Sequence, residues 1–185
     1  MSTVCDILSL LEETKNDYWN ISRETGDFLE FLIKISKSKS ILETGTSNGY
    51  SAIRQALALK ENGGGRLITV EYWEKRRILA RENFEKCGLN DIIVSLQGKA
   101  EEVIPEKLQN EKFDFVFMDA NKSGYLKIFR QIDKLLTPGG IIVADDVLSH
   151  AQSVKPFVDE ISNDKNYEVQ ILNLPDGVLV ARKKS

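Results

Sequence analysis

Three acidic residues and one lysine are spaced so that they could bind a metal ion and move a proton. Asp119 follows one apolar stretch, and Asp145 and Asp146 follow another. Lys122 lies three residues beyond Asp119. Three carboxylates held together repel one another unless a cation or raised pKa values relieve them, and an all-oxygen ligand set favours a hard ion such as Mg²⁺, Mn²⁺ or Ca²⁺. The alternative left by spacing alone is that one acid caps a helix and the others are solvated.

A second group of residues, within Ile41–Ser51, could hold a nucleotide or nucleoside. A short apolar strand there runs into two glycines four apart, Gly45 and Gly49, and then into the start of a helix. Glycines at such a turn let the backbone approach a ligand, and the helix offers free N–H groups. The spacing is neither that of a dinucleotide fingerprint nor that of a P-loop. Glu71 follows Gly49 by 22 residues, where a carboxylate could accept hydrogen bonds from both ribose hydroxyls. The alternatives are a plain strand-to-helix turn and a solvated charge.

Alternating strands and helices are expected to position both groups. Stretches of helical apolar spacing at Val4–Leu11 and Phe28–Ile35 predict a helical preface within 1–38, followed by an α/β core at 39–185 in the same single domain (1–185). Strands are expected at 39–43, 66–71, 92–96, 113–118, 141–144, 167–173 and 178–182. Helices are expected at 49–62, 73–87, 100–109 and 122–136, after which Pro138-Gly-Gly makes a turn, and from near Ser153. This order predicts a doubly wound, mostly parallel sheet that binds ligands beyond the carboxyl ends of its strands.

Composition is ordinary for a soluble globular domain. The chain has 185 residues, 42% hydrophobic and 29% charged, with a formal net charge of −3. That charge argues against a broad nucleic-acid footprint. Cys5 and Cys87 form no disulfide framework, and no apolar run approaches the length of a membrane span. We therefore expect a soluble cytoplasmic protein with no membrane partner.

The two groups of residues, taken together and in order, resemble the class I S-adenosylmethionine-dependent methyltransferases. More narrowly, the chain is similar to the cation-dependent O-methyltransferases that include catechol and caffeoyl-CoA O-methyltransferases. The resemblance runs from about Ile21 to Arg182. It is carried by 41–51, 69–71, 113–122 with Tyr125, 139–148 and Asp176-Gly177. It implies a Rossmann-like sheet of seven strands with an antiparallel last strand, helices on both faces, and methyl transfer to a hydroxyl of a small-molecule acceptor.

The resemblance also implies a role for each matching residue. The S-adenosylmethionine site would be formed by Glu43, Gly45, Ser47, Gly49, Ser51, Glu71, Tyr72, Gly98, Ala100, Glu101 and Asp119. The divalent cation, Mg²⁺ or else Mn²⁺ or Ca²⁺, would be held by Asp119, Asp145 and Asp146. Lys122 would be the general base. A free phenol has a pKa near 10, so a cation that stabilises the phenolate, and a lysine whose pKa that cation depresses, would suit the reaction.

Two departures from the family pattern affect these implications. Family members commonly have Asp-Asn where this chain has Asp145-Asp146. A third carboxylate would bind the cation more tightly but would weaken its acidifying effect on the acceptor. The substrate loop is also short, with only Leu148–Gln152 before the next helix. His150, the sole histidine, could face the acceptor, although a capping or solvated position is the simpler interpretation.

Other functions remain open from the sequence. Basic residues around Lys34–Lys39, Arg76–Arg81 and Arg182–Lys184 could contact phosphates, which would suit methylation of a hydroxylated tRNA base. A nicotinamide-dependent dehydrogenase lacks its glycine fingerprint here, and a non-catalytic nucleoside-binding protein would not need Lys122 and three acids. The resemblance further implies a homodimer, with the N-terminal helices as candidate contacts.

Overall fold

Seven strands form one sheet at the centre of the molecule. The structure is a computed structural model that describes residues 3–184, so Met1, Ser2 and Ser185, which the predicted segments 1–38 and 39–185 include, lie outside the described residues. The strands are β1 (Ser40–Thr44), β2 (Arg66–Glu71), β3 (Ile93–Gln97), β4 (Phe113–Met118), β5 (Leu136–Ala144), β6 (Tyr167–Leu172) and β7 (Val178–Lys183). Single-domain organisation stays a prediction.

The strand order is β3-β2-β1-β4-β5-β7-β6. Strands β1 to β5 are parallel, and β7 lies antiparallel between β5 and β6. The order reverses between β1 and β4, which is where doubly wound sheets open a ligand crevice. The predicted seven-stranded, mostly parallel fold with an antiparallel last strand is therefore confirmed.

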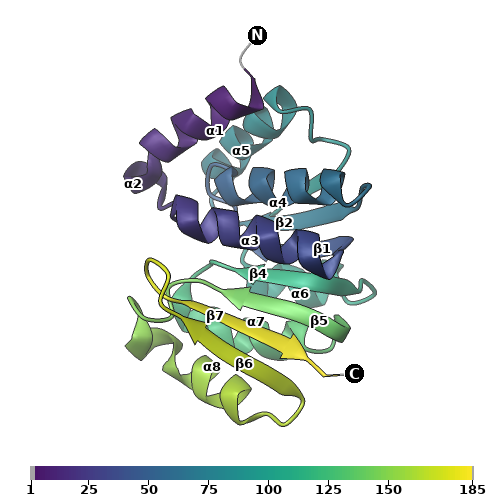
Figure 1. Cartoon of the computed structure of the whole chain (residues 1–185), viewed down its shortest axis with the longest axis vertical. Helices are drawn as coiled ribbons and strands as arrows, with labels where there is room; N and C mark the ends of the chain where they lie inside the picture. Colours follow the sequence, from purple (N-terminus) through teal and green to yellow (C-terminus); the bar gives the residue numbers. More distant parts are fainter. Residues whose placement is uncertain (1–2, 185) are drawn as a thin grey trace.

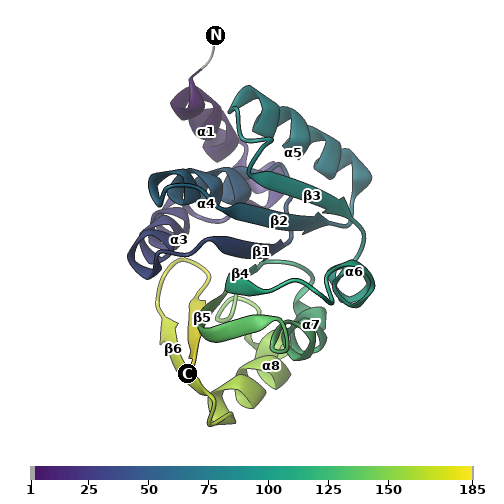
Figure 2. The same ribbon diagram turned by 90° about the vertical axis from the view of Figure 1, so that its right-hand side faces the viewer.

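Helices cover both faces of the sheet, as Figures 1 and 2 show. They are α1 (Val4–Glu13), α2 (Lys15–Tyr18), α3 (Arg23–Ser36), α4 (Tyr50–Glu61), α5 (Glu74–Lys86), α6 (Ala100–Lys107), η1 (Lys122–Gly124), α7 (Tyr125–Ile132) and α8 (Ala151–Asn163). Figure 2 places α3 and α4 on one side of the sheet and α6, α7 and α8 on the other. None of the helices among residues 3–184 is both long and apolar enough to cross a membrane.

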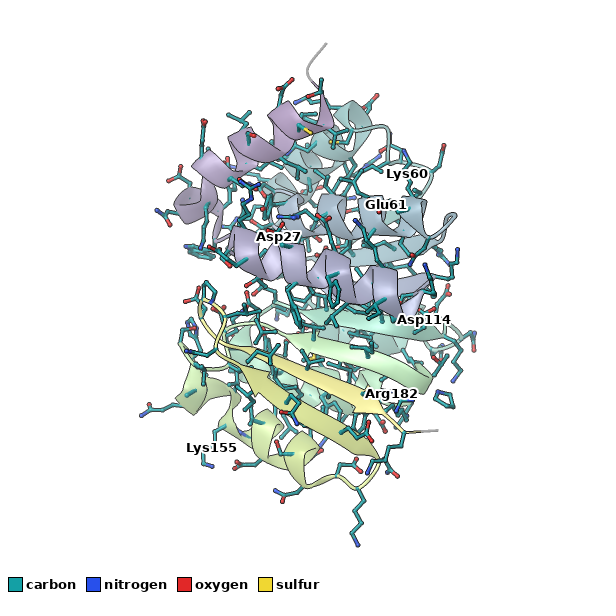
Figure 3. All side chains as sticks on the ribbon, viewed as in Figure 1. Asp27, Lys60, Glu61, Asp114, Lys155 and Arg182 are labelled. Carbon is teal, nitrogen blue, oxygen red and sulfur yellow. The ribbon has the colours of Figure 1, made fainter. Side chains whose placement is uncertain are left out.

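The side chains of the central strands alternate between two apolar cores (Figure 3 draws the side chains as sticks). Leu42, Val116 and Ile142 pack toward α6, α7 and α8. Ile41 and Phe115 pack in the other core, with residues of α3 and α4. Strands buried on both faces read as continuous apolar runs, which is why 113–118 and 141–144 were recognisable in the sequence.

Several predicted boundaries are wrong. The helix predicted at 122–136 is a short 3₁₀ turn, η1, followed by α7, which ends at Ile132. The expected turn at Pro138-Gly-Gly lies inside β5, whose pairing with β4 shifts between Leu136 and Ile141. That bulge accommodates a proline, which has no N–H to donate to a regular ladder. The last helix begins at Ala151 rather than near Ser153, and α2 was not predicted.

Candidate active site

Lys122 stands between two of the predicted acids. Its Nζ atom lies 2.5 Å from Oδ1 of Asp119, at the end of β4, and 2.6 Å from Oδ2 of Asp146, just after β5. All three side chains are largely buried. Burial alone would lower the pKa of Lys122, but the charges of Asp119 and Asp146 and the phenol of Tyr125 outweigh it, so its pKa is raised. With only these neighbours, Lys122 is an ammonium ion.

Tyr125 holds the ends of β4 and β5 together. Its hydroxyl accepts a hydrogen bond from Lys122 Nζ at 3.1 Å and donates toward the main-chain oxygens of Met118, at 2.9 Å, and Asp145, at 3.2 Å. Its ring is fully buried and packs edge-on against Phe157 of α8. Tyr125 therefore positions Lys122 relative to both strand ends. The sequence marked it only as part of the family pattern.

Asp145 is the most deeply buried of the acids after β5. Its side chain is 4% exposed, and Oδ1 has no hydrogen-bond partner among the described residues. Burial raises the pKa of this carboxyl, and repulsion from Asp119 and Asp146 raises it further. Burial likewise raises the pKa of Asp119, against the opposing effect of Lys122. The cluster thus has more negative charge than one lysine neutralises.

The acids supply the oxygen ligands that a divalent cation prefers, but in this structure they are not arranged around a common metal position. Among residues 3–184, no group of three or more His, Cys, Asp or Glu side chains is arranged to hold a metal ion. The position between Asp119 and Asp146 is taken by the Lys122 ammonium. A divalent ion would nevertheless satisfy the buried Asp145 Oδ1, which has no partner among residues 3–184, and would relieve the repulsion among the carboxylates.

The glycine turn after β1 packs directly against this cluster. A Cβ atom at Gly45, where φ is +96°, would collide with the carbonyl oxygen of Asp119, and one at Gly49 would meet the ring of Phe84 on α5. Packing inside the protein therefore requires glycine at both positions, whether or not a ligand binds there. Because Gly45 touches Asp119, a molecule bound at the turn lies next to the acid–lysine cluster.

Glu71, at the end of β2, is bound to the same turn. Its Oε2 atom accepts the N–H of Thr46 at 3.1 Å and of Ser47 at 2.8 Å, while Oε1 accepts the N–H of Trp73 at 2.8 Å. Three backbone donors thus already use this carboxylate, and its binding of the ribose hydroxyls stays a prediction. Ser47 has φ of 50°, and its hydroxyl donates to the Tyr18 carbonyl at 2.5 Å.

Glu43 lies deeper than its predicted role implies. It is fully buried and accepts hydrogen bonds from Ser51 at 2.6 Å, Gln55 at 2.7 Å and Thr69 at 2.5 Å. Burial raises the pKa of Glu43 to about 7, against the effect of these donors. In this structure Glu43 and Ser51 bind each other inside the core and do not line an open cleft.

The remaining predicted cofactor residues border the ends of β2 and β3. Tyr72 is 51% exposed, with its ring 5.0 Å from that of Trp73. The N–H of Gly98 bonds to the carbonyl of Glu71 at 2.9 Å. Ala100 and Glu101 begin α6. These residues follow the ends of β2 and β3, and their role in binding the cofactor stays a prediction.

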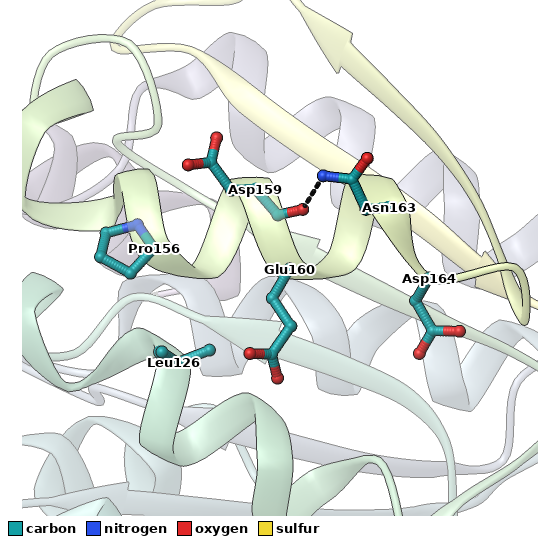
Figure 4. Close-up of a pocket in the computed structure, with 6 residues that line it drawn as sticks. All are labelled: Leu126, Pro156, Asp159, Glu160, Asn163 and Asp164. Carbon is teal, nitrogen blue, oxygen red and sulfur yellow. Dashed lines mark hydrogen bonds between the residues drawn. The ribbon is translucent and has the colours of Figure 1, made fainter.

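A shallow hollow of about 650 Å³ on α7 and α8 contains none of these residues (Figure 4). Its lining includes Asp159, Glu160 and Asp164, and the hydrogen bond drawn there, from Asn163 to the Asp159 carbonyl at 2.7 Å, is local to α8. A second groove, of about 700 Å³, lies between α5 and β3 and also contains none of them. Neither hollow therefore coincides with the predicted site at the strand ends.

A family model described as O-methyltransferase matches residues 5–184. The chain belongs to this O-methyltransferase family. It is 30% identical over 200 residues to a caffeoyl-CoA O-methyltransferase from Populus kitakamiensis, covering 94% of this chain and 84% of the relative. It is 39% identical over 131 residues to a catechol O-methyltransferase from Niastella koreensis, covering 70% of this chain and 58% of that relative's length.

Solved O-methyltransferase structures share the whole fold. The O-methyltransferase from Bacillus cereus in complex with SAH (S-adenosylhomocysteine) has a TM-score of 0.87 and 30% identity and covers 100% of this chain and 91% of its own. An SAH-bound methyltransferase from Podospora anserina has a TM-score of 0.87 at 28% identity and covers 97% of this chain and 88% of its own. The predicted family, its Rossmann-like fold and the enzyme class are therefore confirmed, and S-adenosylmethionine is supported as the cofactor.

A further acid lies near the candidate site and was not among the predicted site residues. Asp176, in the β6–β7 loop, has φ of 66°, and its carbonyl accepts the N–H groups of Leu148 and Ser149, both at 3.0 Å. Gly177 packs against Leu148, where a Cβ atom would not fit. The β6–β7 loop thus supports the short substrate loop, and the Asp176 charge helps to raise the pKa of Asp119. The sequence marked Asp176 only as part of the family pattern and not as a neighbour of the other acids.

His150 lies beside Asp146, at the edge of the candidate site. Its side chain is 52% exposed, and Nδ1 lies 3.8 Å from Oδ1 of Asp146 and 3.1 Å from the Ser149 hydroxyl. It occupies the residue before α8 and makes no side-chain capping bond there. The solvated position is thus the one observed.

Proposed function

We propose that this chain transfers the methyl group of S-adenosylmethionine to a hydroxyl of a small molecule that carries two vicinal oxygens, as a catechol does, with help from a divalent cation. The observation that supports the proposal most directly is the position of Lys122 between Asp119 and Asp146, one contact away from the glycine turn through Gly45. The proposed proton acceptor, the proposed cation-binding acids and the glycine turn proposed to bind the cofactor then lie next to one another.

The residues of the chain have distinct tasks in this reaction. Glu71 and the turn that includes Ser47 bind the ribose side of the cofactor, so that the sulfonium methyl faces the strand ends. Tyr125 fixes Lys122, and Lys122 Nζ, when it is in its neutral amine form, takes the proton from the acceptor hydroxyl. The oxygen then forms a bond to the methyl carbon, the carbon–sulfur bond breaks, and S-adenosylhomocysteine leaves as a neutral thioether. Holding both reactants in line supplies much of the rate.

Asp119, Asp145 and Asp146 would hold the cation. A bound divalent ion would stabilise the acceptor as its anion and, by neutralising the carboxylates, lower the pKa of Lys122 toward a range in which it can accept a proton. The chain's own contribution is the excess of buried carboxylate, including the unpartnered Asp145 Oδ1. Asp146 adds a negative charge compared with an asparagine and would strengthen cation binding.

The test is transfer of labelled methyl from S-adenosylmethionine to 3,4-dihydroxybenzoate and to caffeate, with Mg²⁺ and with excess chelator. We expect transfer with Mg²⁺ and its loss with chelator. Transfer that persists undiminished with chelator would refute the role of the cation. Absence of transfer to either acceptor in both conditions, with S-adenosylhomocysteine still bound, would exclude a catechol-type acceptor and turn attention to other hydroxyls, including those of tRNA bases.

We also propose that the chain forms a homodimer through its N-terminal helices. Phe31 and Ile35 on the outward side of α3 are 58% and 64% exposed, and Leu10 on α1 is 58% exposed. A second copy could cover such side chains. Light scattering after size exclusion should give twice the mass of 20.9 kDa, and Phe31→Ser should reduce it. A single-chain mass for the unaltered protein would refute the dimer.

A further inference from the structure

The groove of about 700 Å³ between α5 and β3 lies apart from the predicted site. β3 is an edge strand of the sheet, and Figure 2 shows α5 beside it. A volume of several hundred Å³ is typical of sites that bind small molecules. The residues that line this groove include none of those proposed to bind the cofactor, the cation or the acceptor. A ligand in the groove would therefore occupy a second site.

Two buried polar atoms in the lining of the groove have no hydrogen-bond partner among residues 3–184. They are Nε of Arg77, on α5, and the hydroxyl oxygen of Ser95, on β3. A buried donor without a partner destabilises the folded protein, because it has lost its hydrogen bonds to water and gained none. Both groups can donate, so together they favour a ligand that carries acceptor oxygens.

The groove also carries positive charge that the protein does not neutralise by ion pairs. Arg77 and Arg81 lie four residues apart on α5, where like charges repel each other. The arginines that form ion pairs among residues 3–184 are Arg54, Arg66, Arg130 and Arg182. Glu82 and Glu85 also line the groove, but they are exposed, whereas Arg77 is half-buried. Water therefore screens the charge of Arg77 less than the charges of these acids, and the lining favours an anion.

The rest of the lining is apolar. Phe84 and Ile93 are almost fully buried and form the floor of the groove, while Ile78 and Val94 are 46% and 37% exposed. Apolar side chains that remain exposed in a groove gain stability when an apolar surface covers them. A ligand that combines an apolar body with an anionic oxygen group therefore matches the whole lining.

The floor of the groove contacts the glycine turn. A Cβ atom at Gly49 would meet the ring of Phe84, so ring and turn are already in close contact. The side chain of Asn83, the preceding residue of α5, donates a hydrogen bond to the carbonyl of Asn48 at 2.9 Å. One side of α5 thus supports the turn, and another lines the groove. A ligand that packs on Phe84 would hold α5 in the position that supports the turn.

We propose that the groove between α5 and β3 binds an aromatic carboxylate, and that the bound anion strengthens cofactor binding through Phe84 and Asn83. The carboxylate accepts hydrogen bonds from Arg77 and Ser95, and the aromatic body lies against Phe84 and Ile78. The binding site itself does not depend on the proposed function. Its effect on the cofactor rests on the proposed cofactor site.

The probe for this site is 2-naphthoate, which joins two fused rings to one carboxylate. An NMR titration should give a dissociation constant of about 1 mM or below, as expected for a ligand of this size. The amide signals that shift should belong to α5 and β3. The uncharged 2-naphthamide should bind about tenfold more weakly, because it lacks charge-assisted hydrogen bonds. Absence of binding, or shifts confined to the ends of β4 and β5, would overturn the proposal.

Substitutions in the lining test which side chains hold the carboxylate. We expect Arg77→Gln to weaken binding of 2-naphthoate about tenfold and Ser95→Ala to weaken it about threefold. Lys75→Gln removes a positive charge from the same helix, but Lys75 does not line the groove, so this control should bind as the unaltered chain does. An affinity of Arg77→Gln within twofold of the unaltered chain would overturn the site.

The effect on the cofactor is measured as the affinity for S-adenosylhomocysteine with and without saturating 2-naphthoate. We expect the anion to tighten nucleoside binding about fivefold and, by linkage, the nucleoside to tighten anion binding by the same factor. Unchanged or weaker nucleoside binding would overturn the effect on the cofactor. Failure of the unaltered chain to bind S-adenosylhomocysteine at all would instead refute the cofactor site, while the Arg77 and Ser95 variants would still decide the anion site.

Discussion

The Lys122 ammonium lies 2.6 Å from the Asp146 carboxylate, although the two residues come from different strand ends, β4 and β5. The ion pair links the residues that follow β4 with those that follow β5. It also means that a cation entering between the acids must share or displace the charge of Lys122. Four predictions follow from this cluster and from the buried groups around it.

Replacing Lys122 tests its role as proton acceptor. Lys122→Met keeps most of the side-chain volume but removes the amine, and we expect the rate of methyl transfer to fall by about 10² to 10⁴, the usual contribution of a positioned general base. The affinity for S-adenosylhomocysteine, measured by calorimetry, should change little because Lys122 makes no bond to the glycine turn. Undiminished turnover by Lys122→Met would refute the role.

A divalent cation should stabilise the protein by mass action. Mg²⁺ or Mn²⁺ at 100 times its dissociation constant would add about 2.7 kcal/mol to the free energy of unfolding, equivalent to roughly 5 to 10 °C in the melting temperature. Asp145→Asn should abolish most of this shift, whereas Asp159→Asn, an exposed acid on α8, should retain it. Equal shifts in both variants would show that the ion binds elsewhere.

The buried Glu43 should make stability depend on pH. Its pKa is raised from 4.5 to about 7 by burial, so between these values the folded chain holds a proton that the unfolded chain has lost. This contribution to the free energy of unfolding is therefore present below pH 4.5 and is lost as pH rises through 7. Glu43→Gln removes the ionisable group, so at pH 8 it should be more stable than the unaltered chain by roughly 1 to 3 kcal/mol.

Urea unfolding at pH 4.5 and pH 8 measures the effect of Glu43. The two chains should differ little at the lower pH, and the exposed control Glu13→Gln should show no such dependence. A Glu43→Gln difference that is the same at both pH values would mean that Glu43 does not titrate in this window.

Alanine variants of Gly45 and Gly64 can distinguish the cost of backbone strain from the cost of a steric clash. Both have positive φ, +96° and +95°, but only Gly45 faces an atom that a Cβ would strike, the Asp119 carbonyl oxygen. Gly45→Ala should therefore lower the free energy of unfolding by about 1 to 3 kcal/mol more than Gly64→Ala does. It should also weaken binding of S-adenosylhomocysteine, because it separates the turn from β4. Equal losses of stability would show that the turn can move away from Asp119.

The sequence predicted the fold well because the central strands are apolar on both faces and glycines mark the turns between elements. The prediction of one helix at 122–136 failed. Its last residue, Leu136, has helical apolar spacing but pairs with Phe113 in the sheet. Pairing between distant strands outweighs local spacing there. The proline and glycines that suggested a turn instead sit in a bulge of β5.

The sequence proposed which residues belong to the candidate site, but it gave little of their arrangement. The order of strand ends indicated that Asp119 and Asp145 would meet near Lys122. It did not reveal that Glu43 turns into the core, that Glu71 is bound by turn N–H groups, or that Asp176 approaches from a loop nearly 60 residues beyond Asp119. Such contacts depend on side-chain direction and on the packing of distant loops, which spacing along the chain does not encode.

The place of β7 has a consequence for the order in which the protein matures during synthesis. β7 is the last of the seven strands to be made, yet it must insert between β5 and β6, which precede it. Until it does, the segment after Asp146 lacks the Asp176 and Gly177 carbonyls that fix it. The parallel strands around the glycine turn can pair earlier. A nascent chain would therefore form the proposed nucleoside pocket before the proposed acceptor side, which would be completed only when β7 inserts.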